Sequence, residues 1–101
     1  MDLTITDVPS AKRFEARDGD ALAGFAVYIP TDEMIVFTHT EVPPSYAGQG
    51  VGGALVRGAL DDVRDRGLAV LPLCPFVKAW IGRHPDYADL VYSAPESRVS
   101  D

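Results

Sequence analysis

Four glycines stand within six residues, from Gly48 to Gly53, between an extended run and an amphipathic one. Glycine adopts backbone dihedrals that other residues avoid, and it lets the backbone approach a ligand closely. At the start of a helix, such a segment presents free N–H groups and the positive end of the helix dipole, and both stabilise a phosphate. The cluster therefore predicts a strand–loop–helix unit with an anion site. The alternative is a glycine-rich helix start that binds nothing.

The second half of the chain alternates predicted helices and strands. Apolar residues repeat at helical spacing over Ala54–Arg66, and Gly67 suits the C-terminal cap of that helix. A strand is predicted over Leu68–Leu73. A second helix is predicted over Pro75–Arg83, because proline is favoured in a first turn, and Pro85 should end it.

The first half is predicted to be strands joined by tight turns. Leu3–Asp7 and Arg13–Arg17 are the first two, and Asp18-Gly19 suits a hairpin turn that leads into an antiparallel Ala21–Ile29. The last strand before the glycines is predicted over Met34–Val42. It is apolar on both faces at its start and polar near its end.

Hairpins followed by helix, strand and helix indicate an α+β fold, a mostly antiparallel sheet with two helices packed on it. The strand after the first helix should run parallel to the strand before it, as a right-handed βαβ crossover. Ligand sites tend to form where such strands end. We expect Phe76 and Trp80 to lie in the core. One domain is predicted over residues 1–93, with a soft tail at 94–101.

Composition narrows the function. A formal net charge of -6 argues against a nucleic-acid partner, because phosphate-backbone binding needs a basic surface. The longest nearly uncharged run, Gly67–Val77, is too short to span a membrane. The N-terminus lacks the pattern of a signal peptide, and the single cysteine cannot form an internal disulfide. We therefore expect a cytoplasmic protein, and no metal site is predicted.

Two well-known phosphate loops do not match the glycine cluster. A Walker loop would continue with Gly-Lys-Ser/Thr, which is absent. Gly48, Gly50 and Gly53 do fit the dinucleotide fingerprint, but that motif needs an acidic residue at the end of the next strand. This chain has Leu71–Cys74 there. The dinucleotide interpretation is therefore rejected.

The segment Glu41–Leu55 resembles the pyrophosphate-binding motif of the GNAT acetyltransferase superfamily, a strand followed by Arg/Gln-x-x-Gly-x-Gly/Ala opening a helix. Ala47 departs from the motif at its Arg/Gln position. His39–Pro43, Cys74–Ile81 and Arg83–Tyr87 are similar to a short single-domain branch of that superfamily. The resemblance extends from about residue 13 to residue 91.

The resemblance implies an acetyl-CoA-dependent N-acetyltransferase in which an acceptor amine attacks the thioester directly. Backbone amides of the glycine loop would bind the phosphates, and an amide at the end of the preceding strand would hold the thioester carbonyl. The residues implied for the cofactor are Thr40, Val42, Gly48, Gln49, Gly50, Val51, Gly52, Gly53 and Lys78.

Three side chains are candidates for moving protons. Glu41 and His39 share a face of the predicted strand near its end, so each is a candidate base for the amine. The alternative is that Glu41 is solvated and that His39 is a packed polar residue. His39 follows Ile35 and Phe37 on the face expected to be buried, and this position favours a functional role for it. Cys74 should sit at the start of the second helix, where the dipole favours a thiolate. It is a candidate proton donor or nucleophile, and the alternative is an inert buried cysteine.

The acceptor is left open: a polyamine, a protein amine or a small metabolite. An acyl-CoA-binding module or sensor without turnover is the main alternative function. A small interaction protein with a purely structural glycine loop is the second. An exposed sheet edge also leaves a homodimer open.

Overall fold

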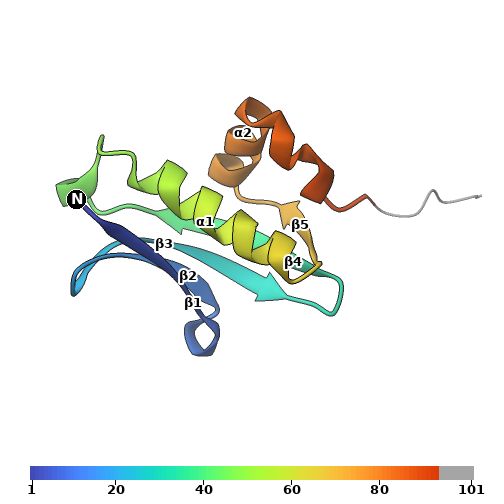
Figure 1. Cartoon of the computed structure of the whole chain (residues 1–101), viewed down its shortest axis with the longest axis horizontal. Helices are drawn as coiled ribbons and strands as arrows, with labels where there is room; N and C mark the ends of the chain where they lie inside the picture. Colours follow the sequence, from blue (N-terminus) through green and yellow to red (C-terminus); the bar gives the residue numbers. More distant parts are fainter. Residues whose placement is uncertain (94–101) are drawn as a thin grey trace, which may run out of the picture.

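A computed structural model describes residues 1–93, so the predicted tail at 94–101 lies outside the described residues. Five strands form one sheet in the order β1-β2-β3-β4-β5 (Figure 1). The strands are β1 (Leu3–Val8), β2 (Arg13–Asp18), β3 (Ala21–Pro30), β4 (Met34–Glu41) and β5 (Ala69–Pro72). The first three pairings, β1 with β2, β2 with β3 and β3 with β4, are antiparallel, as predicted.

Two α-helices and three short 3-10 helices complete the described chain. They are η1 (Pro9–Ala11), η2 (Pro44–Tyr46), α1 (Val51–Asp65), α2 (Pro75–Arg83) and η3 (Pro85–Leu90). Helix α2 has the predicted bounds. Helix α1 begins three residues before the predicted Ala54, inside the glycine cluster, because Val51 is buried in the core and holds the first turn in helical form.

The predicted βαβ crossover is confirmed. Strand β5 pairs with β4 in parallel, from Met34 opposite Ala69 to Phe37 opposite Pro72. Helix α1 connects them and lies on the sheet, and Gly67 ends it in the left-handed region at φ +70°. Beyond Phe37, strand β4 continues with a neighbour on the β3 side alone.

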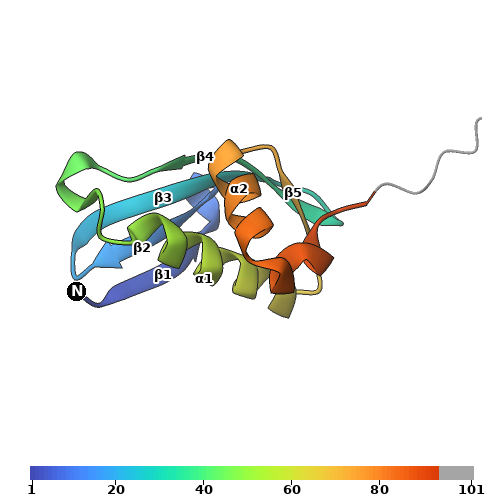
Figure 2. The same ribbon diagram turned by 90° about the horizontal axis from the view of Figure 1, so that it is seen from above.

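Both α-helices lie on one face of the sheet (Figures 1 and 2). The core between them and the sheet contains an aromatic group of three rings, Phe14, Tyr28 and Phe37, with centroids 5.4–6.3 Å apart. Trp80 is buried, as predicted. Within residues 1–93, no helix is long and apolar enough to cross a membrane.

The other face of the sheet carries charge. Glu15 on β2 is buried there, and its carboxylate accepts hydrogen bonds from Arg17 and Arg13. These bonds lower the pKa of Glu15. The Arg13 guanidinium lies 4.5 Å from the centre of the Phe25 ring on β3. This face therefore has one buried carboxylate paired with two arginines, beside an aromatic ring.

Candidate functional site

The first turn of α1 has free backbone donors. Gly48 and Gly50 have φ of +77° and +78°, and Gly50 is the N-terminal cap residue, with no side-chain hydrogen bond to the turn. The first amide that reaches a carbonyl is that of Ala54, which bonds to Gly50. Within the described residues, the N–H groups of Val51 to Gly53 have no acceptor, and no acidic residue lies in the turn. Three unpaired donors at the positive end of a helix dipole suit a phosphate.

The loop before α1 is tied to the sheet. The Tyr46 hydroxyl donates a hydrogen bond of 3.0 Å to the carboxylate of Asp18 at the end of β2. This hydrogen bond raises the pKa of Tyr46. The Gln49 side chain donates to the carbonyl of Ser45. The first contact ties the loop to β2 and the second lies within the loop, while Gly48 and Gly50 stay exposed.

A β-bulge near the end of β4 changes which residues face the helices. Tyr28 pairs with Phe37, but the preceding residue of β3, Val27, pairs with His39, so Thr38 is an extra residue. The bulge reverses the alternation of the strand. His39 and Glu41 therefore lie on the open face, and both are exposed. The expectation that His39 follows the buried face is wrong, because the inserted residue turns it outward.

The same bulge brings Thr40 to the helix face, next to the start of α2. The Thr40 hydroxyl lies 3.4 Å from the Cys74 sulfur, and either atom can donate. Cys74 is 3 % exposed and is the N-terminal cap residue of α2. Its N–H continues the β4–β5 ladder by bonding to the carbonyl of Phe37. The end of β4 and the start of α2 thus meet at a threonine and a thiol.

Two contacts bring the start of α1 close to its neighbours. A Cβ built on Gly24 in β3 would lie 3.2 Å from a methyl of Val51, in the first turn of α1. It would also lie 3.0 Å from the carbonyl oxygen of Glu41 and 3.3 Å from a methyl of Val42, so the end of β4 lies beside that turn. Phe76 lies over Gly52 and is 41 % exposed. The prediction that Phe76 belongs to the core is wrong, because its ring packs on the outside of the first turn of α1.

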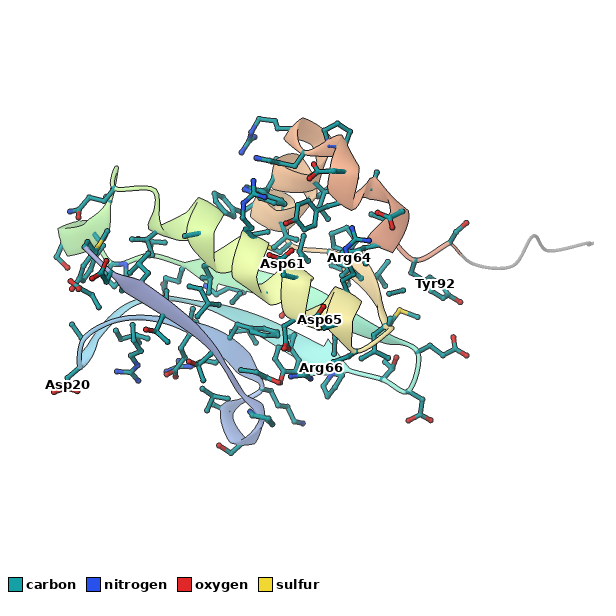
Figure 3. All side chains as sticks on the ribbon, viewed as in Figure 1. Asp20, Asp61, Arg64, Asp65, Arg66 and Tyr92 are labelled. Carbon is teal, nitrogen blue, oxygen red and sulfur yellow. The ribbon has the colours of Figure 1, made fainter. Side chains whose placement is uncertain are left out.

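Further along, an aromatic cluster fixes α2 and η3 to α1. His84 stacks on Trp80 at 3.8 Å, and the Tyr87 hydroxyl donates to Asp61. That hydrogen bond is the largest cause of the raised pKa of Tyr87, and burial adds to it. Arg57 lies over Trp80 and donates to the Tyr87 hydroxyl, so its guanidinium is engaged away from the glycine loop. Figure 3 shows Asp61 on the side of α1 that faces α2.

The predicted site residues thus fall into two groups. The glycine loop, Thr40, Val42 and Cys74 lie on the helix side of β4, whereas His39 and Glu41 lie on the open side. Lys78 is exposed on α2, one turn after Cys74. Sequence reasoning missed the contacts of Gly24 and Phe76, although a glycine inside a strand signals a close backbone approach.

A family model for GCN5-related N-acetyltransferases matches residues 13–90, which is most of the chain. The chain belongs to this N-acetyltransferase family. A solution structure of a GCN5-like protein from Staphylococcus aureus, itself a candidate N-acetyltransferase, superimposes with a TM-score of 0.68 at 23 % identity. The match covers 95 % of this chain and 94 % of that one, and it confirms the α+β fold. A comparison with curated proteins finds no match.

Members of an N-acetyltransferase family are enzymes, and the predicted enzyme class is confirmed at that level. The donor set at the start of α1 fits a pyrophosphate, because it offers unpaired amides without a competing carboxylate.

Proposed function

We propose that this N-acetyltransferase moves the acetyl group of acetyl-CoA to an acceptor amine by direct attack. The observation that carries the proposal is the uncapped first turn of α1, where the amides of Val51, Gly52 and Gly53 have no protein acceptor in the described chain. The end of β4 lies beside this turn, so a phosphate on the amides and a thioester at Thr40 suit one extended ligand.

Bound acetyl-CoA supplies an activated thioester, and the residues around it orient the acetyl group and move protons. Backbone donors at the end of β4, near Thr40 and Val42, polarise the carbonyl. Cys74 and Thr40 lie 3.4 Å apart, so the thiol is oriented by a hydroxyl and can give a proton to the departing sulfur. Because the amine attacks the thioester directly, the proposal needs no acetyl-cysteine intermediate at Cys74.

The acceptor amine approaches from the open face of the sheet in this proposal. His39 and Glu41 both lie there, at the same strand end as Thr40 but on the opposite face. One of them takes the proton that the attacking amine loses, directly or through water. Beyond Phe37 the edge of β4 has no β5 partner among the described residues, and the amine reaches the thioester carbon past this edge. The base and the thiol then act on different atoms, so the two proton transfers do not compete.

Calorimetric titration with acetyl-CoA and with free CoA tests the cofactor site. Gly50→Glu should abolish saturable binding, because it places a carboxylate at the donor turn. Gly67→Glu is the matched control: its φ of +70° resembles the +78° of Gly50, but it lies at the other end of the 15-residue helix, about 22 Å away. The control should bind normally. Absence of binding by the unmodified protein would contradict the proposal.

Turnover separates an enzyme from an acyl-CoA sensor. Mass spectrometry should detect acetylation of at least one of a polyamine, a peptide N-terminus, a lysine peptide or a small amine. Glu41→Gln and His39→Gln should leave the Kd for acetyl-CoA unchanged, and loss of the true base should lower kcat by about 100-fold or more. Tight binding with no turnover of any amine would instead support the sensor.

A further inference from the structure

Phe76 is an exposed aromatic residue beside the candidate ligand site. It lies in the first turn of α2, is 41 % exposed and stands outside the core cluster of the described residues. The ring offers apolar surface to a ligand beside the donor turn of α1, which it contacts at Gly52.

The contact with Gly52 is sterically specific. A Cβ built on Gly52 would lie 2.7 Å from Cζ of the Phe76 ring and 3.2 Å from Cε2. The ring therefore occupies the volume that any other side chain at position 52 would need. Gly52 has no positive φ, unlike Gly48 and Gly50, so backbone conformation alone does not require glycine there. Glycine is required at position 52 because the Phe76 ring occupies the space of a side chain.

The first turn of α2 connects the two ends of the candidate site. At its start, the Cys74 sulfur contacts Thr40 at the end of β4, and two residues later Phe76 contacts Gly52 in the donor turn of α1. A ligand that holds its phosphates on the donor turn and its thioester at Thr40 must pass along this segment. The Phe76 ring is the apolar surface on that route.

We propose that Phe76 is a positioning residue for the uncharged arm that joins the phosphates of acetyl-CoA to its thioester, and that Gly52 is glycine to admit the ring. The inference rests on the proposed function. The arm carries methylene and methyl groups, and packing against the ring removes apolar surface of both from water. Phe76 thereby directs the thioester toward Thr40 and Cys74.

Two ligands distinguish an arm contact from a general effect on the site. Acetyl-CoA contains the arm, and adenosine 3′-phosphate 5′-diphosphate is the nucleotide half of coenzyme A without it. Phe76→Ala should raise the Kd for acetyl-CoA about tenfold and leave the Kd for the nucleotide half within twofold. Trp80 is the single tryptophan and lies 3.5 Å from the Cβ position of Gly53, so its fluorescence can report both titrations.

Three further variants sharpen the test. Ile29→Ala, which truncates an exposed apolar residue at the far end of β3, should change neither Kd. Phe76→Leu should give an intermediate Kd for acetyl-CoA. Gly52→Ala should weaken acetyl-CoA binding by displacing the ring, and it should add no further loss in a Phe76→Ala background.

Equal weakening of both ligands by Phe76→Ala, or fully additive losses in the double variant, would overturn the inference. An unchanged acetyl-CoA Kd in Phe76→Ala would overturn it as well. If the unmodified protein bound neither ligand, the proposed function itself would fail, and that result is distinct from a failure of the arm contact alone.

Discussion

Replacing Gly58 by alanine should destabilise the protein, although alanine is the better helix former. Gly58 lies in the middle of α1, and a Cβ there would be 2.8 Å from Cβ and Cγ1 of Ile5 on β1. Carbon atoms pack well at about 3.5–4.0 Å, so helix and strand would have to separate by roughly 1 Å. Ile5 Cβ cannot rotate away, because it is fixed to the strand backbone.

The magnitude follows from two opposing effects. Alanine gains about 1 kcal/mol over glycine in a helix interior, and overpacking of a close contact costs about 1–3 kcal/mol. We expect Gly58→Ala to lower the free energy of unfolding by about 1 kcal/mol. Gly82→Ala is the matched control, because no atom lies within 4 Å of its Cβ position in α2. It should raise the free energy of unfolding by up to about 1 kcal/mol.

Urea unfolding, monitored by circular dichroism and by Trp80 fluorescence, measures the free energy of unfolding of both variants. The m-values should stay equal, so that the midpoints report stability directly. The two variants should move the midpoint in opposite directions. If Gly58→Ala stabilised the protein as much as Gly82→Ala does, the close approach of β1 to α1 would be refuted as the reason for glycine at this position.

Two further predictions concern the sheet. Glu15→Gln should lower the free energy of unfolding by about 1–2 kcal/mol at pH 7, through the lost charge-assisted bonds to Arg13 and Arg17. Because the folded pKa of Glu15 is lowered, its contribution is full above the unfolded pKa and is lost as pH falls through the folded pKa, so the gap between variant and unmodified protein should close in acid. Lys12 has a φ of +52° after η1, a left-handed conformation that glycine adopts at lower cost. We expect Lys12→Gly to raise the free energy of unfolding by about 0.5–1 kcal/mol and Lys12→Ala to change it little, and thermal unfolding measures both.

Local patterns predicted much of the fold, because they act over a few residues. The bounds of α2, the hairpins and the turn at Gly67 depend on proline, glycine and apolar spacing, and all were confirmed. The start of α1 was predicted three residues too far along the chain, because glycine has a low helix propensity. The burial of Val51 in the core decides the actual start. Burial of that kind depends on residues distant in sequence.

The site was harder to predict than the fold. The glycine loop lies between the end of β4 and the start of α1, as the motif predicts, whereas the contact between Thr40 and Cys74 was not predicted. The outward turn of His39 does not follow from the motif, because a bulge is a property of two paired strands and not of one. The exposed position of Phe76 depends on the distance between two helices, which no single periodicity encodes.

The bulge at Thr38 separates the side-chain pattern of β4 from its residue count. Thr38 is the one residue between Phe37 and His39, whose partners Tyr28 and Val27 are neighbours on β3. Deleting Thr38 would make these pairs continuous, so His39 would stay on the open face and Thr40 on the helix face. What a deletion would remove is the local bend and the added twist that a bulge gives a strand, at the point where β4 loses its pairing with β5. The extra residue therefore shapes the opening between these two strands.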